Sequence, residues 1–228
     1  MNSSSTRENL SAFEAESQAF KNKLTKDEEY ALSKYMSLSF EYINPILREE
    51  TGEGQFFDNE FNNQNSHERA QELIPKIDSA LAKHIGKKKH LTYRAFTVKG
   101  KQNVDEYIAS HYKIGDTVSD KAYLSTAADP DYLLLHNEFS HDRMFVFEIL
   151  GKNGVPVHTI NAEEYAASPS NYEREVLYPR NTKFKVVGIT QNTYESSYDK
   201  YAINRIKSFF YNFSIKKATY SVVQLMEI

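Results

Sequence analysis

The sequence has no cysteine and no tryptophan, and only eight glycines and six prolines among its 228 residues. The absence of cysteine excludes disulfide bonds, thiol nucleophiles and cysteine-ligated zinc. Among the histidines, His136 and His141 lie five residues apart without a third ligand nearby, so we expect no metal site. No segment is rich enough in Gly, Pro or Ser to separate two domains. We therefore expect one domain over residues 25–228, preceded by a helical or flexible extension at 1–24.

Long hydrophobic runs and an excess of one charge are also missing. No apolar run reaches the length needed to cross a bilayer, and the N-terminus MNSSSTRENLSAFEAES has no apolar core of a signal peptide. The formal net charge of −3 provides no basic field for general nucleic-acid binding. These features predict a soluble protein that acts in a cytoplasm, without a membrane partner and with direct nucleic-acid binding disfavoured.

The first third of the chain has the spacing of helices. Thr25 and Glu28 form a predicted capping box ahead of a run with apolar residues at helical intervals. Pro45 is expected to break or kink that helix just after Asn44. A further helix is predicted from residues 65–66 to Gly86, where glycine favours a helix end.

From residue 90 onward, short runs rich in aromatic and β-branched residues alternate with turns, which is typical of strands. Short helices are expected at 103–110 and 161–167. Helices first and strands later predict an α+β fold, with N-terminal helices packed on a mainly antiparallel, two-sheet β core. The expected strands are HLTYRAFTV, KAYLSTA, RMFVFEIL, VPVHTI, REVLY, TKFKVVGIT and SVVQLMEI.

Three short motifs in this strand-rich region carry candidate chemistry. On a strand, Glu173 and Glu175 would share one face, and paired carboxylates suit reactions that pass through a sugar oxocarbenium ion. Arg94, beside Tyr93, is suited to bind phosphate through its planar fork. Ser125 ends another strand and can orient a carboxylate or a ribose.

Each motif also has a purely structural interpretation, which the motif alone favours. The two glutamates can line a solvated strand edge, and Arg94 can pair with a surface acid. Ser-Thr pairs such as Ser125-Thr126 are common in turns.

The order of the motifs is more specific than any one of them. The chain has an aromatic-Arg pair first, then a strand that ends in Ser-Thr, and then Glu-x-Glu. This order resembles the arginine-specific mono-ADP-ribosyltransferases, in particular their branch of bacterial toxins, effectors and phage enzymes. The run LTKDEEYALSKYMSLSFEYINPILRE is similar to that branch's N-terminal helix, and KIGDTVSDKAYLSTA to its run into Ser-Thr-Ser. FVFEILGKNGVPVHTI and EREVLYPRNTKFKVVGI resemble its next hairpin and its catalytic strand. The resemblance covers roughly residues 25–190 and a last strand at 221–228.

The chain departs from the family pattern at two positions of these motifs. Ala127 stands at the third place of Ser-Thr-Ser, which removes one hydroxyl while the leading Ser125 is kept. Ala95 follows Tyr93-Arg94, where relatives often have glycine. Residues 195–220 and the first 24 residues match no part of the pattern.

The resemblance implies roles for individual residues with NAD as the substrate. Arg94 would hold the diphosphate, Ser125 would position the catalytic glutamate, and Thr126 would support the strand beside the cofactor. Glu175 would bind the ribose 2′-hydroxyl and stabilise the oxocarbenium ion as nicotinamide leaves. Phe139 is placed to stack on nicotinamide, and Arg143 to reach phosphate.

The resemblance also implies how an acceptor is chosen. Glu173 would orient an arginine of the target protein and accept its proton, because a charged guanidinium is a poor nucleophile. Tyr165 and Tyr172, in the segment facing the target, are candidate recognition residues, with packing of that segment as the alternative. The target would lie in the cytoplasm of a host cell, reached by an injected effector or a phage enzyme.

Two other functions remain open from the sequence. One is an NAD glycohydrolase, in which water is the acceptor; retention of Glu173 argues against it. The other is a non-catalytic NAD-binding module of the same fold; retention of Arg94, Ser125 and Glu175 argues against that.

Overall fold

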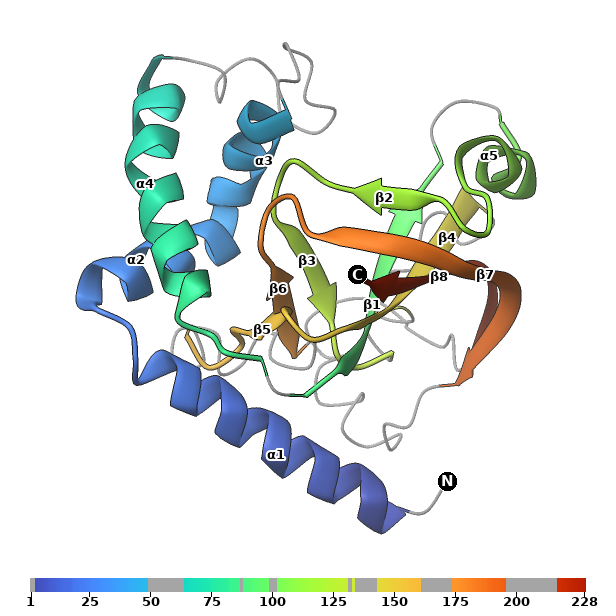
Figure 1. The fold of residues 1–228 in the computed structure, drawn as a ribbon, viewed down its shortest axis with the longest axis horizontal. Coiled ribbons are helices and arrows are strands. Elements are labelled where there is room, and N and C mark those ends of the chain that lie inside the picture. The colour runs from blue at the N-terminus through green and yellow to red at the C-terminus, as the bar shows by residue number, and fades with distance from the viewer. Residues whose placement is uncertain are drawn as a thin grey trace, which may run out of the picture.

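The computed structural model describes eight stretches of the chain, and all structural statements below refer to them. They are residues 3–48, 64–86, 88–98, 102–130, 133, 143–160, 174–195 and 217–228. Within them the element order is helical first and strand-rich later, so the predicted α+β class is confirmed (Figure 1).

The N-terminal helices form a layer beside one end of the sheet (Figure 1). The predicted capping box is present: Glu28 N–H bonds the Thr25 hydroxyl, and the Glu28 carboxylate accepts the Thr25 N–H. The helices are α1 (Ser3–Lys21), α2 (Lys26–Lys34), a π-helical turn (Tyr35–Ser39), α3 (Phe40–Arg48) and α4 (Gln64–Ala82).

The expected break at Pro45 does not occur, because α3 continues through it to Arg48. Proline removes one backbone hydrogen bond and crowds the preceding turn. The apolar face of α3 offsets this cost: Ile43 is fully buried, and Ile46 and Leu47 pack against the same core. Tertiary packing therefore outweighs the local signal at this position.

The strands form one hydrogen-bonded sheet in the order β2-β7-β8-β4-β1-β3-β6-β5. Neighbouring strands are antiparallel except β4 and β8, which are parallel. The predicted mainly antiparallel sheet is thus observed. The strands are β1 (His90–Thr97), β2 (Thr117–Ser119), β3 (Leu124–Ala127), β4 (Met144–Gly151), β5 (Val155–Pro156), β6 (Glu175–Tyr178), β7 (Lys183–Glu195) and β8 (Lys217–Glu227).

Two sheets were expected, but the strands form one sheet whose two parts are joined by a single residue pair. β1 pairs with β4 along its whole length, but with β3 only at Tyr93 opposite Ala127. The strands β3, β6 and β5 therefore form a small unit that joins the larger one at a single pair. Strand twist lets the two units diverge on either side of it.

The helices α2, α3 and α4 cover the small unit, and their shared core includes Tyr123, Val155 and Leu177 from the sheet side. The expected short helix near 103–110 is α5 (Val104–His111), which contacts β8. The helix expected at 161–167 lies outside the described residues. None of the described helices has the length and apolar character needed to cross a membrane.

Candidate active site

Two of the predicted site residues, Ser125 and Glu175, meet across the β3–β6 pair. Ser125 lies opposite Leu177 and Ala127 lies opposite Glu175, so both polar side chains share one face, diagonally across the ladder. The Ser125 hydroxyl donates to Glu175 Oε1 at 2.7 Å. A donor at this distance fixes the orientation of the carboxylate.

Arg94 reaches the same place from β1. Its Nη1 donates to the carbonyl oxygen of Ser125 at 3.3 Å, and its guanidinium lies 5.8 Å from the centroid of the Phe96 ring. The Nε donor is buried and has no hydrogen-bond partner among the described residues. A buried guanidinium N–H without an acceptor raises the free energy of the folded state. An anionic ligand that accepts this hydrogen bond would remove that cost, so the group is well suited to bind one.

A second guanidinium comes from the end of α3. Arg48 forms a bidentate pair with Asp120, with Nε–Oδ1 2.8 Å and Nη2–Oδ2 2.6 Å. Burial acts to raise the pKa of Asp120, but the bonds from Arg48 and the Ala122 N–H lower it below its ordinary value. Asp120 is thus held as a carboxylate, and it fixes the direction of Arg48.

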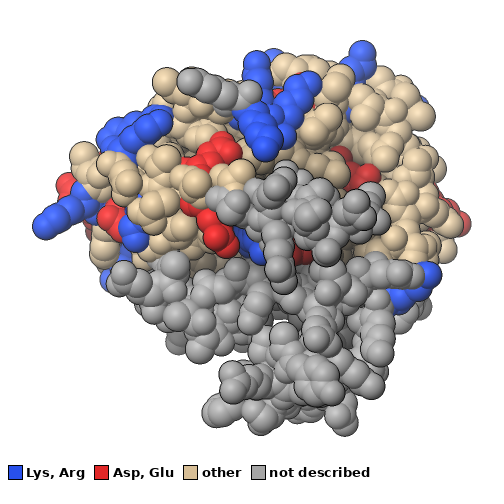
Figure 2. All heavy atoms as spheres, turned by 90° about the horizontal axis from the view of Figure 1, so that it is seen from below, with Lys and Arg blue, Asp and Glu red and all other residues tan. Residues whose placement is uncertain are grey.

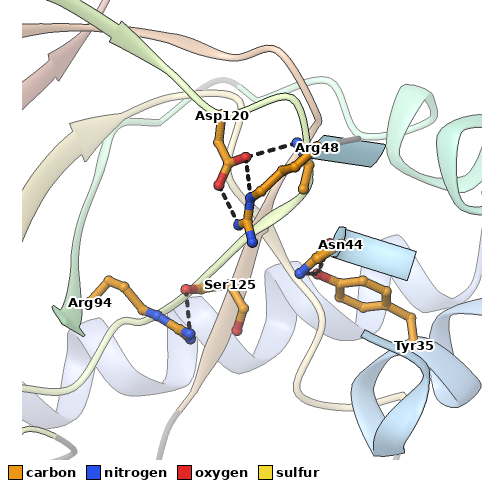
Figure 3. Close-up of polar contacts among 7 residues, drawn as sticks. Tyr35, Asn44, Arg48, Arg94, Asp120 and Ser125 are labelled. Carbon is orange, nitrogen blue, oxygen red and sulfur yellow. Dashed lines mark hydrogen bonds and ion pairs between the residues drawn. The ribbon is translucent and has the colours of Figure 1, made fainter. Parts of the chain in front are cut away.

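Figure 3 shows the guanidinium groups of Arg48 and Arg94 pointing into one region between the helices and the sheet, beside Ser125. Tyr35, from the π-helical turn, points into the same region and is hydrogen-bonded to Asn44. Burial raises the pKa of Tyr35 far above its ordinary value, and the Glu175 charge acts in the same direction. Tyr35 therefore stays a neutral phenol next to two cations and a carboxylate.

Thr126 lies on the opposite face of β3 from Ser125. Its side chain is 3% exposed, and its hydroxyl donates to the Val176 carbonyl at 2.8 Å. Thr126 therefore ties β3 to β6, which supports the strand that carries Glu175. Contact of Thr126 with a cofactor stays a prediction.

The strand that carries Glu175 does not include Arg174. β6 begins at Glu175, and Arg174 has a left-handed backbone with φ of 46°. Arg174 is held there because its Nη1 bonds Asp129 Oδ2 at 2.8 Å and its carbonyl accepts the Ala128 N–H. The alternation that would place Glu173 on the face of Glu175 is therefore interrupted at Arg174.

The remaining predicted residues lie elsewhere or are not described. Arg143 donates to the Val98 carbonyl at 2.6 Å, four residues along β1 from Arg94, which is roughly 13 Å of extended chain. Its predicted phosphate contact stays a prediction. Phe139, Tyr165, Tyr172 and Glu173 lie outside the described residues.

Arg48, Asp120 and Tyr35 lie in no motif that predicts a site residue. They come from segments 85 residues apart along the chain, and no local pattern shows that they meet. Together with Arg94, Ser125 and Glu175 they form a site that can hold an anion and present a carboxylate to a hydroxyl or to a developing cation. Within the described residues, no group of three His, Cys, Asp or Glu side chains is arranged to hold a metal ion.

The chain is similar to known proteins in sequence pattern and in fold. The family model described as ADP-ribosyltransferase exoenzyme matches residues 12–208. No curated protein has a matching sequence. Solved structures share the fold at low identity. The enzymatic component C2-I of the C2 toxin from Clostridium botulinum is 18% identical with a TM-score of 0.59, covering 94% of this chain and 45% of that one.

Two further structures were obtained with small molecules. BECa, an ADP-ribosylating toxin of C. perfringens solved with NADH, is 17% identical with a TM-score of 0.63, covering 98% of this chain and 48% of that one. Vis, an ADP-ribosyltransferase from Vibrio splendidus solved in complex with agmatine, is 16% identical with a TM-score of 0.58, covering 100% and 86%.

The chain spans about half the length of C2-I and BECa. Because the family model covers most of the sequence, the assignment rests on it, while the solved structures support the fold. The chain belongs to the ADP-ribosyltransferase exoenzyme family.

Proposed function

We propose that this protein transfers the ADP-ribose of NAD to an arginine side chain of a target protein and releases nicotinamide. The observation that carries the proposal is the Ser125–Glu175 hydrogen bond of 2.7 Å beside Arg94, whose Nε is buried and has no partner among the described residues. One group is oriented to act on a sugar, and the other is ready to bind phosphate.

The two arginines suit the diphosphate of NAD. A guanidinium stays charged at any physiological pH and binds phosphate oxygens bidentately. Arg94 offers its Nε, which has no partner in the part of the chain that the structure describes. Arg48, with its side chain 35% exposed, offers a second positive group from the helix side. Asp120 offsets part of the Arg48 charge, so the site holds a dinucleotide without excess positive charge.

Glu175 acts at the ribose. Its carboxylate accepts a hydrogen bond from the 2′-hydroxyl and stabilises positive charge as the C1′–N bond to nicotinamide breaks, with both electrons leaving on nicotinamide. Ser125 keeps the carboxylate oriented through this change. Preorganisation matters because a carboxylate that must reorient during the reaction loses most of its stabilising effect.

The acceptor is proposed to be a guanidinium. A new bond forms between C1′ and an arginine nitrogen, which loses one proton, and Glu173 is the proposed acceptor of that proton. The Vis complex with agmatine supports this choice, because agmatine carries a guanidinium group. A target protein inside a host cell is likewise proposed, in keeping with the toxins among the structural neighbours.

Labelled NAD tests the proposal, in reactions with and without agmatine and with a cell lysate as a source of protein acceptors. We expect labelled agmatine, and labelled protein bands carrying ADP-ribose on arginine. Glu175→Gln should lower turnover by about 10³-fold without changing the unfolding midpoint, since it removes charge stabilisation in the transition state. Glu173→Gln should lose transfer yet retain NAD hydrolysis.

The other outcomes separate the alternatives. Free ADP-ribose as the sole product, with agmatine present, would indicate a glycohydrolase. Absence of any NAD turnover would indicate a binding module. Full transfer activity in Glu175→Gln would refute the role given to that carboxylate.

A further inference from the structure

Helix α1 contacts a short segment, residues 157–160, that lies next to the strand carrying Glu175. Ser17, on α1, is fully buried. Its hydroxyl lies 2.8 Å from the Thr159 hydroxyl and accepts the Thr159 N–H at 3.2 Å. Lys21, one turn along α1, donates to the Thr159 carbonyl at 3.2 Å. Every polar group of Thr159 is thus engaged by α1.

An aromatic contact reinforces this attachment. Phe13 is 6% exposed, and its ring stacks on His158 with centroids 5.2 Å apart and an interplanar angle of 24°. Figure 1 shows α1 running along the end of the molecule where β5 and β6 lie, and α1 contacts β5 directly. On the face viewed in Figure 2, acidic and basic side chains are interspersed over the described surface.

The same segment holds the backbone of Glu175. β5 pairs with β6 through Val155 opposite Leu177 and Pro156 opposite Val176. The Val157 N–H then donates to the Glu175 carbonyl at 3.0 Å. Val157 is two residues from Thr159, so a shift of Thr159 is transmitted to Glu175 through a short length of chain.

β6 has different support on its two sides. On one side it pairs with β3, whose own position is fixed by the buried Thr126 bond to Val176. On the other side is β5, an edge strand of only two residues. So short an edge strand holds its neighbour weakly unless it is itself supported. The core around Val155 supports β5 itself, and α1 supports the residues that follow it through Thr159.

We propose that α1 is a positioning element of the active site, in which Ser17 and Thr159 hold the segment that fixes the Glu175 backbone. The inference rests on the proposed function of Glu175. Ser17 and Thr159 do not touch the substrate; they act through Val157. Because small displacements of a catalytic group reduce rate strongly, loss of the Ser17–Thr159 contact should reduce turnover more than substrate affinity.

A matched pair of variants at Thr159 tests this. Thr159→Val removes the hydroxyl and keeps the shape, whereas Thr159→Ser keeps the hydroxyl. With labelled NAD we expect Thr159→Val to lower kcat by about 10-fold with KM for NAD within about 2-fold. Thr159→Ser should stay within about 2-fold of the wild type. Gln18→Ala, at an exposed site on the same helix bonded only to Asn22 in the described structure, is the control for α1 itself.

Hydrogen exchange gives a readout that does not depend on activity. The Val157 amide should exchange faster in Thr159→Val, and at the wild-type rate in Thr159→Ser. Equal kcat in all three proteins, or equal loss in the Val and Ser variants, would overturn the inference. So would a fall in kcat that matches the loss of folded protein, because a lower folded fraction lowers the apparent kcat and leaves KM unchanged. A wild-type protein that does not turn over NAD would instead overturn the proposed function, whatever the exchange data.

Discussion

Replacing Glu28 with glutamine should destabilise the protein at neutral pH by about 3 kcal/mol. Glu28 is only 6% exposed and joins α2 to α4. Its carboxylate accepts the Thr25 N–H at 2.7 Å and the Ser79 hydroxyl at 2.8 Å, and it pairs with Lys83 Nζ. Glutamine has nearly the same shape, but it carries no charge and offers one acceptor oxygen fewer.

The magnitude follows from the pKa of Glu28. Burial acts to raise this pKa, but the bonds from Lys83, Thr25 and Ser79 together lower it from 4.5 to about 2. Each tenfold change in proton affinity is worth about 1.4 kcal/mol, so the ionised carboxylate stabilises the fold by about 3 kcal/mol at pH 7. Because the folded state binds the proton more weakly, this contribution is present above pH 4.5 and is lost as the pH falls toward 2.

Urea unfolding at several pH values between 7 and 3 measures the effect. The difference between wild type and Glu28→Gln should shrink from about 3 kcal/mol at pH 7 to about 1.4 kcal/mol at pH 3. Glu29→Gln is the control, since Glu29 is 38% exposed and pairs with Lys21 at 3.2 Å; it should cost less than about 1 kcal/mol. A Glu28 effect that equals that of Glu29, or that stays constant with pH, would refute the reasoning.

Two further outcomes are expected. Thr126→Val should lower the free energy of unfolding by about 1–3 kcal/mol, because it removes the buried donor to Val176. The kcat of the folded protein should stay within about 3-fold of the wild type. A large loss of kcat without loss of stability would assign Thr126 to the chemistry. Burial lowers the pKa of His84 below 6.5 despite the opposing effect of Glu16. The free energy of unfolding should therefore fall as the pH drops below 6.5, and His84→Gln should make this dependence on pH less steep. Urea unfolding at pH 7 and pH 5 checks this, and an unchanged slope in the variant would contradict it.

Much of the β region could be predicted from the sequence, because strand alternation and motif order are local. Arg94, Ser125 and Glu175 were expected to share a site, and in the structure Ser125 contacts both of the others. Arg48 and Tyr35 were missed as site residues, since a helix pattern shows which face is buried but not which strand that face meets.

Two local expectations, a helix break at Pro45 and a strand that runs through Arg174, were wrong, while a kink at Pro45 stays a prediction. Helix α3 continues through Pro45 because packing of its apolar face offsets the local cost. The strand expected over Glu173–Glu175 begins one residue after Arg174, because Arg174 takes a left-handed backbone with its side chain paired to Asp129. Neither the packing nor the pairing partner lies near these residues in the sequence, so pattern alone does not predict them.

The site lies where the sheet is joined most weakly, and this placement has a physical reason. A fully paired ladder between β1 and β3 would bring side chains of the two strands into contact along its length and leave little room for a ligand. Here the strands share only the Tyr93–Ala127 pair. Arg94 is the next residue along β1 from Tyr93, and Ser125 lies two residues back along β3 from Ala127. Divergence of the two strands after one pair thus leaves space between Arg94 and Ser125, which are still joined by the hydrogen bond from the Arg94 side chain to the Ser125 carbonyl. The helices complete this opening with Arg48 and Tyr35, so the expectation of two separate sheets missed the junction on which the site depends.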